Sequence, residues 1–327
     1  MSPASATGGR WTAADVPDQR GRTAVLTGAG AGIGLETARE LARHGATVIL
    51  ACRDLGQAGR AADQLRAGSG PASVRVVHLD LASLASVREA ASEIRSTCPR
   101  LDLLINNAGV MTPPYQRTED GFELTFATNH LGHFALTGLV LDRLLATPGS
   151  RIVTVSSVAH ARGVMNFDDL QFERGYQASL TYAQSKLANL LFAYELQARL
   201  EAAGAPVISL AAHPGVVRTG LWQHSSGPER VLISPRLRLL NSRLVQDPAA
   251  GALPSLRAAT DPAARGGEYY GPSGWREFTG RPVRVESSSR SHDAAAQRRL
   301  WEVSEQLTGV TYRIPAAAAA RGTREGK

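Results

Sequence analysis

Lysine and cysteine are both scarce in this chain of 327 residues. Lysine occurs only as Lys186 and Lys327, so arginine supplies the rest of the 36 basic residues. The two cysteines, Cys52 and Cys98, are too few for a disulfide framework, which favours a reducing compartment. No apolar run approaches the ~18 residues that cross a bilayer, and residues 1–10 lack the apolar core of a signal peptide. We therefore expect a cytoplasmic protein without an integral membrane segment.

A localised charge of one sign is also missing, although the formal net charge is +7. The arginines are scattered along the chain, whereas nucleic-acid binding needs a localised basic face. No Cys/His/carboxylate cluster with metal-ligand spacing accompanies His130 or His213. We expect no nucleic-acid partner, no bound metal, and structural roles for both histidines.

What the sequence does contain is a repeated alternation of short apolar runs and helical stretches. The apolar runs are continuous, as expected for strands that are covered on both faces of a sheet. Strand–helix repeats of this kind require parallel pairing with right-handed crossovers. Strands are predicted over residues 23–27, 47–52, 74–78, 101–106, 152–156 and 207–212. Helices are predicted to end near residues 44, 67, 97, 145 and 203, the fourth of them beginning near residue 120.

The repeat continues to about residue 260 without a linker-like break. We therefore predict one α/β domain over residues 22–314, built on a single doubly wound parallel sheet with helices on both faces. Residues 1–21 are small and polar and are expected to form a flexible leader. Residues 315–327 are expected to form a flexible tail.

A glycine-rich turn follows the first predicted strand. Its spacing is T-G-x-x-x-G-x-G, formed by Thr27, Gly28, Gly32 and Gly34, whereas G-x-G-x-x-G fails in every register. Glycines in such a turn let the backbone approach a pyrophosphate at the N-terminus of the next helix. The position between a strand and a helix favours a dinucleotide site over a turn without a ligand.

The end of the second strand indicates which dinucleotide binds. Arg53 follows the strand tip at Cys52, and a guanidinium suits the 2′-phosphate of NADP(H). Asp54 opens the next helix and is interpreted as its N-cap. NADP(H) is therefore favoured, with NAD(H) as the alternative in which Asp54 binds the ribose.

A phenol and an ammonium lie four residues apart in Tyr182-Ala183-Gln184-Ser185-Lys186, on one face of a predicted helix. A free phenol with a pKa near ~10 is a poor proton shuttle at neutral pH, and a nearby cation stabilises the phenolate. Lys186 is the only lysine before the last residue of a chain that otherwise uses arginine, which strengthens the pairing. Ser157 follows the fifth strand at the edge where ligands bind in such sheets. Asn129 is an amide within an apolar helix, where it needs partners.

Together these residues resemble the short-chain dehydrogenase/reductase family, with a match over about residues 23–270. The sequence looks most like the retinol-dehydrogenase-like branch in residues 51–54, 128–134, 185–189 and 213–217. It differs from many animal members in lacking an N-terminal membrane anchor. The resemblance implies a Rossmann-type fold. Its motifs are Thr27-Gly28-x-x-x-Gly32-x-Gly34, Asp80-Leu81, Asn107-Ala108-Gly109, Asn129, Ser157, Tyr182-x-x-x-Lys186 and Pro214-Gly215.

The resemblance also implies a role for each of these residues. Tyr182 would be the general acid/base while a hydride passes between nicotinamide and a small lipophilic carbonyl or alcohol substrate. Lys186 would lower the pKa of Tyr182 and bind the nicotinamide ribose. Ser157 would orient the carbonyl, and Asn129 would hold a water linking Lys186 to solvent. The other cofactor contacts would be Thr27, Gly28, Gly32, Ile33, Gly34, Arg53, Asp80, Leu81, Asn107, Ala108, Gly109, Pro214, Gly215 and Thr219.

Residues 221–245 combine apolar side chains with interleaved arginines. They are interpreted as an amphipathic surface helix, as an apolar lid over the substrate, or as a segment that associates with a membrane surface. A homodimer or homotetramer is a further expectation.

Two other function classes are consistent with parts of the pattern. A nucleotide-sugar epimerase or dehydratase shares Tyr-x-x-x-Lys but is disfavoured by the glycine spacing. A catalytically silent NADP(H)-binding regulator is disfavoured because Asn129, Ser157, Tyr182 and Lys186 are all present.

Overall fold

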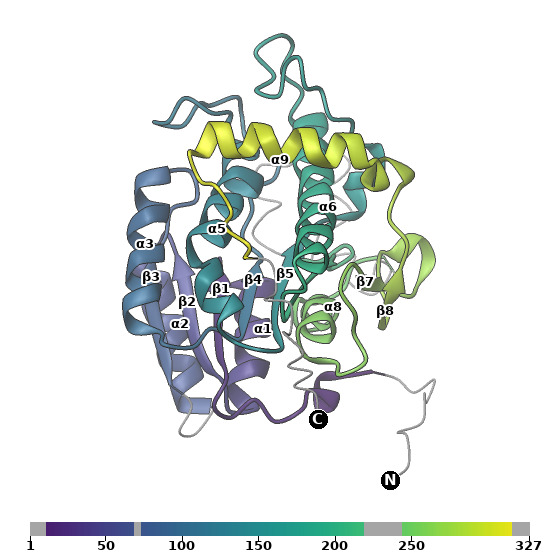
Figure 1. Ribbon diagram of the computed structural model, residues 1–327. Coiled ribbons are helices and arrows are strands. Elements are labelled where there is room, and N and C mark those ends of the chain that lie inside the picture. Colours follow the sequence, from purple (N-terminus) through teal and green to yellow (C-terminus); the bar gives the residue numbers. More distant parts are fainter. Residues whose placement is uncertain (1–10, 69–72, 219–243, 316–327) are drawn as a thin grey trace, which may run out of the picture.

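The protein is built around a sheet of eight strands (Figure 1). The structure, a computed structural model, describes residues 11–68, 73–218 and 244–315. In spatial order the strands are β3 (Val74–His78), β2 (Thr47–Cys52), β1 (Thr23–Thr27), β4 (Leu103–Asn106), β5 (Ser150–Val155), β6 (Val207–Ala212), β7 (Tyr269–Pro272) and β8 (Pro282–Val285).

The strand order determines where a ligand can bind. Neighbouring strands from β3 to β7 are parallel. The direction in which the chain adds strands reverses between β1 and β4. In an open α/β sheet such a reversal opens a crevice at the carboxyl ends of the strands.

Helices cover both faces of the sheet (Figure 1). On one face lie α1 (Gly32–Arg43), α2 (Leu55–Gly68) and α8 (Pro248–Thr260). On the other lie α3 (Leu84–Thr97), α5 (Gly132–Leu145) and α6 (Ala178–Ala202), with α9 (Ala294–Thr308) packed across α5 and α6. The shorter helices are η1 (Ala13–Asp15), α4 (Leu124–Phe126), η2 (Ala127–Leu131), η3 (Val158–Arg162), η6 (Trp275–Glu277) and η7 (Ser289–His292).

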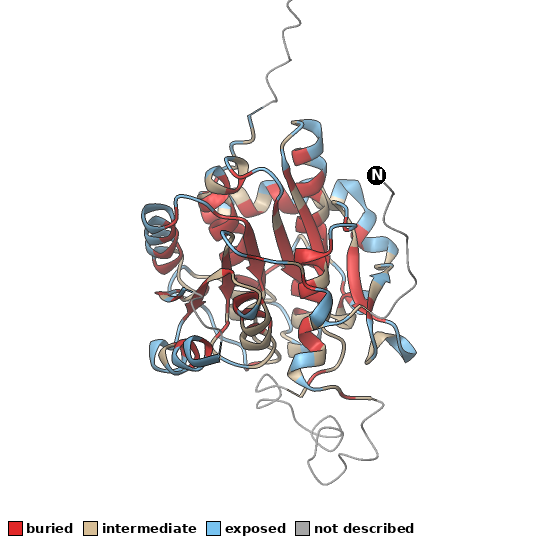
Figure 2. Ribbon diagram, turned by 90° about the horizontal axis from the view of Figure 1, so that it is seen from below, coloured by how far each residue is buried: buried red, intermediate tan, exposed pale blue. Residues whose placement is uncertain are grey.

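The continuous apolar runs correspond to the doubly covered strands. In β1, Leu26 packs into the core beside α1 and α8, and Val25 packs into the core on the opposite face. Both are fully buried, and the central strands of the sheet are buried over nearly their whole length (Figure 2). Alternate residues of a strand point to opposite faces, so a strand covered on both faces needs an apolar residue at each position. The predicted bounds of β1, β2, β3 and β6 are confirmed to the residue, whereas β4 begins two residues later than predicted and β5 two earlier.

The predicted leader is wrong for residues 11–21. Val16 is buried in the same core as α1, and the backbone N–H of Gln19 donates to the carbonyl oxygen of His44 at 2.8 Å. A capping box formed by Thr12 and Asp15 closes η1. A polar segment can be fixed by one apolar anchor and a few backbone bonds, which average composition does not reveal.

The helix predicted from about residue 120 begins later and changes its winding. The carboxylate of Glu123 caps α4 by accepting from the N–H groups of Thr125 and Phe126 at 2.8 and 2.6 Å. The following residues form η2, a π-helical segment that carries Asn129, before regular α5 begins. A π segment is often found at functional sites, but it has no residue pattern that would predict it.

The chain beyond residue 260 contains elements that the sequence pattern did not predict. The strand β8 pairs antiparallel with β7. The sheet was expected to be wholly parallel, and this edge strand is the exception. Its third residue, Arg284, is exposed, which is typical of an edge strand. The helix α9 brings Trp301 against Phe134 of α5, with ring centroids 5.2 Å apart.

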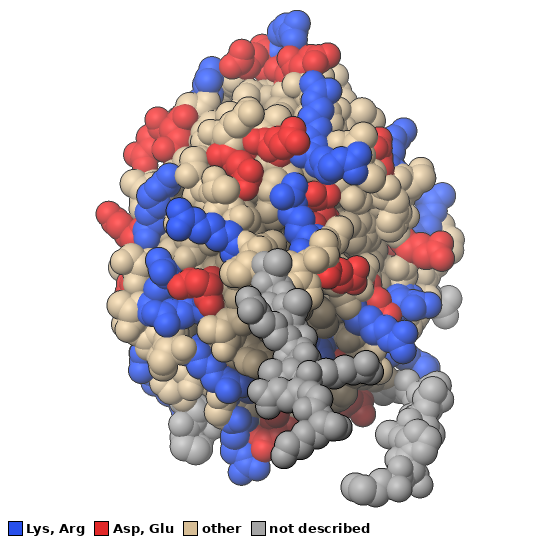
Figure 3. Space-filling view, viewed as in Figure 1, with Lys and Arg blue, Asp and Glu red and all other residues tan. Residues whose placement is uncertain are grey.

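Parts of the prediction lie outside the described residues. These are the proposed lid, except for Leu244 and Val245, and the tail beyond residue 315. In the part of the chain that the structure describes, no helix is long and apolar enough to cross a membrane. On the face drawn in Figure 3, basic and acidic side chains are interspersed and form no patch of one sign.

Candidate active site

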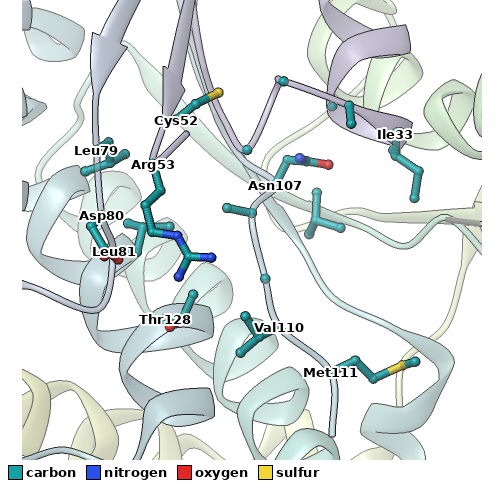
Figure 4. A pocket seen from close by; sticks show the side chains of 18 of the residues that line it. Ile33, Cys52, Arg53, Leu79, Asp80, Leu81, Asn107, Val110, Met111 and Thr128 are labelled. Carbon is teal, nitrogen blue, oxygen red and sulfur yellow. The ribbon is translucent and has the colours of Figure 1, made fainter. Parts of the chain in front are cut away.

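A pocket of about 640 Å³ lies at the carboxyl ends of the central strands (Figure 4). Its volume is within the usual range for small-molecule and cofactor sites. Four predicted residues adjoin lining residues without lining the pocket themselves, namely Thr27, Asn129, Ser157 and Gly215, and Thr219 lies outside the described residues. The predicted residues that do line it are Gly28, Gly32, Ile33, Gly34, Arg53, Asp80, Leu81, Asn107, Ala108, Gly109, Tyr182, Lys186 and Pro214.

The glycine turn requires glycine at two positions for different reasons. Gly28 has a φ of 64°, in the left-handed region. At Gly34 a Cβ atom would lie 2.5 Å from the carbonyl oxygen of Gly28 and 2.6 Å from Nδ2 of Asn107. The turn therefore closes only when residue 34 has no side chain.

The beginning of α1 fits a bound phosphate. The N-cap residue Ala31 provides no side-chain acceptor for the N–H groups of the first turn. These groups have no partner within the helix, and the positive end of the helix dipole lies there. Gly32, Ile33 and Gly34 of this turn line the pocket. The arrangement fits the pyrophosphate of a dinucleotide.

Thr27 ties the glycine turn to the segment after β4. Its buried Oγ1 accepts hydrogen bonds from the N–H groups of Asn107 and Ala108, each at 2.9 Å. The side-chain amide of Asn107 donates back to the carbonyl oxygen of Thr27, also at 2.9 Å. Thr27 thus fixes the backbone of two lining residues although it does not line the pocket.

The tip of β2 separates the two residues weighed for cofactor choice. The carboxylate of Asp54 accepts from the N–H of Gln57 at 2.8 Å, which confirms it as the N-cap of α2. Arg53 is exposed and projects from the strand end toward Asp80 and Leu81 in the pocket (Figure 4). Burial raises the pKa of the neighbouring Cys52 thiol, so this thiol is neutral at physiological pH.

Lys186 is a buried cation one turn after Tyr182 in α6. Its Nζ donates to the carbonyl oxygen of Val155 at 3.1 Å and lies 5.8 Å from the centre of the Tyr182 ring. A Cβ atom on Gly109 would lie 3.5 Å from this Nζ and 3.0 Å from Oδ1 of Asn129, so Gly109 packs against both side chains. Burial lowers the pKa of Lys186 to about 8.

The Tyr182 phenol is influenced by opposing effects. Burial raises its pKa, whereas a hydrogen bond with Ser157 and the positive charge of Arg162 lower it. A charged side chain that lowers this pKa is thus Arg162, in η3, and the expected effect of Lys186 stays a prediction. Sequence reasoning missed Arg162 because it belongs to the short helix after β5, and no motif includes it.

The two serines after β5 face different ways. Ser156 is buried, and its hydroxyl donates to the carbonyl oxygen of Lys186 at 2.7 Å. Ser157 caps η3 by accepting from the N–H of Ala159 at 3.2 Å, and its hydroxyl also bonds Tyr182. The second serine is therefore the one placed beside the phenol.

Asn129 has its side-chain amide hydrogen-bonded to the main chain and to a side chain of the protein. Its Oδ1 accepts from the N–H of Val110 at 2.8 Å, and its Nδ2 donates to the carbonyl oxygen of Val110 at 3.0 Å. The second Nδ2 hydrogen goes to the Ser185 hydroxyl at 2.9 Å. In this structure Asn129 anchors the backbone beside the pocket, and its expected water link to Lys186 stays a prediction.

One wall of the pocket was missed by the sequence analysis. It is apolar and belongs to the loop after β4, which includes Met111 and Pro113. The hydroxyl of Tyr176, from the loop before α6, donates to the carbonyl oxygen of Pro113 at 2.6 Å and fixes this wall. Asp54, weighed as the alternative ribose ligand, also lines the pocket. The lining residues that were not predicted are Gly30, Ala31, Ala51, Cys52, Gln57, Leu79, Val110, Met111, Pro113, Pro114, Gln116, Leu124, Thr128, Val155 and Ser156.

Both histidines expected to be structural are buried. His213 Nε2 lies 2.9 Å from the carboxylate of Glu277, and His130 Nε2 lies 2.8 Å from the Ser304 hydroxyl. Within the described ranges, no group of three or more His, Cys, Asp or Glu side chains could hold a metal ion.

Comparison with known proteins places this geometry in a familiar context. Residues 22–229 match the family model described as short chain dehydrogenase. Human retinol dehydrogenase 14 is 42% identical over 305 residues, covering 89% of this chain and 87% of that protein. Human retinol dehydrogenase 13 is 44% identical over 293 residues, covering 89% of this chain and 85% of that protein.

A solved structure is similar over nearly the whole chain. It is the crystal structure of an uncharacterized protein from Mycobacterium paratuberculosis, 43% identical, with a TM-score of 0.77. The match covers 93% of this chain and 100% of that one.

Proposed function

The chain belongs to the short-chain dehydrogenase/reductase family, in its retinol-dehydrogenase-like branch, and we propose that it is an NADP(H)-dependent enzyme for lipophilic carbonyl and alcohol substrates. Membership of the family makes it an oxidoreductase of CH–OH and C=O groups that uses NAD(P)(H) and a small substrate. The preference for NADP(H), the identity of the acid/base and the class of substrate are the proposal. A cytoplasmic location and a homo-oligomeric state stay predictions.

The observation that carries the proposal is the Ser157–Tyr182–Lys186 arrangement at the pocket. When bound, the nicotinamide supplies or accepts the hydride. Tyr182 gives a proton to the carbonyl oxygen during reduction and takes it back during oxidation, while Ser157 holds the same oxygen by a hydrogen bond. The positive charges of Arg162 and of protonated Lys186 favour the phenolate that forms when the proton leaves.

The dinucleotide would be held by groups that the fold has already fixed. Its pyrophosphate would lie at the N-terminus of α1 and its nicotinamide ribose near Lys186. Asp80 and Leu81 would contact the adenine. Asn129 would bind a water through the remaining lone pair of its Oδ1, which lies beside Gly109 and toward Lys186.

The preference for NADP(H) is supported by the different roles of the two charged residues that follow β2. The Asp54 carboxylate is engaged as a helix cap, whereas the Arg53 guanidinium extends into the pocket. A guanidinium forms paired, charge-assisted hydrogen bonds with a phosphate, and NAD(H) offers no phosphate at this point.

A lipophilic substrate is supported by the apolar wall of Val110, Met111, Pro113 and Pro114. The names of the similar human proteins refer to retinol, a long apolar primary alcohol. A wall without charged side chains favours such a chain over a sugar or a nucleotide sugar.

The test is nucleotide oxidation by the purified protein across a panel of aldehydes and ketones of increasing chain length, with NADPH and with NADH. We expect NADPH-dependent reduction that improves with the length of the apolar chain. Nucleotide binding without turnover of any carbonyl would indicate a silent regulator. Turnover of a nucleotide sugar in the same assay would indicate an epimerase or dehydratase.

A further inference from the structure

A buried histidine joins two parts of the pocket floor that are far apart in sequence. His133 lies in α5 with 1% of its surface exposed. Its Nε2 is 2.8 Å from Oγ1 of Thr27, at the end of β1. Its Nδ1 is 3.0 Å from the main-chain oxygen of Asn129, one turn earlier. The proposed reaction gives this side chain no role.

The hydrogen bonds around Thr27 determine which ring nitrogen carries the proton. A hydroxyl has two acceptor lone pairs and one hydrogen to donate. The N–H groups of Asn107 and Ala108 occupy both lone pairs, so the hydroxyl must donate its hydrogen. The carbonyl oxygen of Ile105 is 3.5 Å away, beyond the usual range, which leaves His133 Nε2 as the acceptor. The ring hydrogen is therefore on Nδ1, which donates it to the main-chain oxygen of the preceding turn.

The two partners of His133 hold opposite ends of one lining segment, residues 107–110. Thr27 binds the first two N–H groups of this segment, and Asn129 binds the N–H and the carbonyl oxygen of Val110. His133 bonds to both anchors and so closes a ring of hydrogen bonds around the segment. The third residue of the segment, Gly109, lies against Lys186.

The ring of hydrogen bonds requires a neutral imidazole. Burial and the positive charge of Lys186 together lower the pKa of His133 to about 4, against the opposing effect of its hydrogen bond with the main chain of Asn129. A protonated ring would lose its acceptor for Thr27 and would bring a second positive charge near Lys186. The neutral form with hydrogen on Nδ1 satisfies Thr27 and Asn129 at once.

We propose that His133 is a positioning residue that couples the nucleotide-binding turn to the catalytic Asn129–Lys186 region by fixing segment 107–110 at both ends. It touches neither substrate nor cofactor and acts through Thr27 and Asn129. The part of the proposal that concerns turnover rests on the proposed oxidoreductase function. The part that concerns nucleotide affinity does not need turnover.

Two substitutions separate the two contacts. In His133→Asn the amide nitrogen takes the place of Nδ1 and can donate to the Asn129 oxygen, but the side chain is too short to reach Thr27. In His133→Gln the side-chain amide reaches the position of Nε2, where its oxygen can accept from the Thr27 hydroxyl. The Asn129 main-chain oxygen then loses its hydrogen bond from residue 133. We expect His133→Asn to weaken NADPH binding about tenfold with kcat nearly retained, the effect of one lost buried hydrogen bond. We expect His133→Gln to lower kcat about tenfold with NADPH affinity nearly retained, and His133→Leu to do both.

His130 provides a matched control on the same helical stretch. It is also 1% exposed, and it also makes one close side-chain hydrogen bond, to Ser304 of α9. That contact faces away from the pocket. His130→Asn should therefore lower Tm as a buried histidine substitution does, while the Kd for NADPH and kcat stay at wild-type values.

The experiment measures three quantities for each variant. They are the Kd for NADPH, measured by fluorescence without substrate, the steady-state kcat with the best aldehyde of the panel, and Tm. The opposite effects of His133→Asn and His133→Gln on Kd and kcat would support the proposal. It is overturned if both change the two quantities in the same proportion, or if His133→Leu matches His130→Asn. If the wild type binds NADPH but turns over no carbonyl, the proposed function fails. The Kd values of the His133 variants for NADPH still decide whether His133 supports the nucleotide-binding turn.

The proton position gives a second test that needs no turnover. In protein labelled with ¹⁵N-histidine, two-bond ¹⁵N–¹H correlations distinguish a protonated from an unprotonated ring nitrogen. With His133→Gln as the assignment control, the account predicts hydrogen on Nδ1 and none on Nε2 at neutral pH. The opposite tautomer would overturn the proposed link to Thr27.

Discussion

The two halves of the pocket are built in different ways. The nucleotide half consists of residues 27–34, 52–54 and 107–109, and it is held mainly by backbone contacts. Thr27 is fully buried and binds two N–H groups, and no side chain fits at residue 34.

The substrate half consists of residues 110–116 together with Ser157 and Tyr182, and side chains on loops shape it. Thr112 has a φ of 48°, which is unfavourable for a β-branched residue, and Tyr115 is 42% exposed. One hydrogen bond from Tyr176 fixes its apolar wall. This difference explains how one fold can keep its nucleotide while the substrate changes: loop side chains can vary without disturbing the backbone of the other half.

The largest expected effect separates the halves completely. Tyr182→Phe removes the proton donor and leaves the backbone of the nucleotide half intact. We expect kcat to fall by about 10²–10⁴, the usual contribution of a general acid or base, with the Kd for NADPH unchanged. Tyr115→Phe is the matched control, because it removes an exposed phenol from the same half without touching the proton path, and its kcat should stay close to that of wild type. A Tyr182→Phe variant with more than about a tenth of wild-type kcat would contradict the assignment of the acid/base.

A methyl group in the nucleotide half should have the next largest effect. Gly34→Ala places Cβ against the Gly28 carbonyl and the Asn107 amide, so the turn must open. Overpacking of this kind costs about 1–3 kcal/mol of stability, and NADPH affinity should fall at least about tenfold. Gly59→Ala in α2 is the control, because its Cβ would meet no atom within 4 Å. It should leave affinity unchanged and raise the free energy of unfolding by about 0.5–1 kcal/mol. Equal nucleotide affinities for the two variants would remove the distinction between the halves.

Removal of the Arg53 side chain, at the edge of the nucleotide half, should reduce the preference for NADPH over NADH about 10- to 100-fold. Arg53→Ala should lower kcat/KM for NADPH about 10- to 100-fold and hardly affect NADH, because it removes charge-assisted hydrogen bonds to the 2′-phosphate. Asp54→Ala should cost about 1 kcal/mol of stability through the lost helix cap, with cofactor preference unchanged. Steady-state kinetics of wild type and both variants with each nucleotide measure these effects. Preference of the wild type for NADH, lost in Asp54→Ala, would reverse the assignment.

The smallest effect is a pH dependence at Lys186, where the two halves meet. Burial lowers its pKa from 10.5 to about 8, so the ammonium is present below that pH and is lost as the pH rises through it. Any step that needs the ammonium should weaken above about pH 8. The unfolded chain keeps this proton up to pH 10.5, so the lysine destabilises the fold fully below pH 8 and progressively less between the two values.

NMR of protein labelled with ¹³C-lysine measures the pKa of Lys186 directly, because Lys327 is the other lysine in the chain and Lys327→Arg removes its signal. A titration near 10.5, the ordinary value, would contradict the burial of the ammonium.

The same division decides what could be predicted from sequence. The glycine spacing and the apolar runs encode backbone geometry, and β1, β2 and the cap at Asp54 were predicted from them correctly. The π segment around Asn129 and the role of Arg162 depend on contacts between elements distant in sequence, which no local pattern records. For the same reason the apolar wall beyond Gly109 and the helix α9 were missed.

The most direct test of the account is isotope transfer from NADPH that carries deuterium at both positions of the reactive nicotinamide carbon. Wild-type protein is incubated with this nucleotide and a long-chain aldehyde, and the alcohol product is analysed by mass spectrometry. The account predicts one deuterium on the carbinol carbon with wild type and no product beyond background with Tyr182→Phe. Oxidation of NADPH without deuterated alcohol, or equal labelling by both proteins, would contradict it.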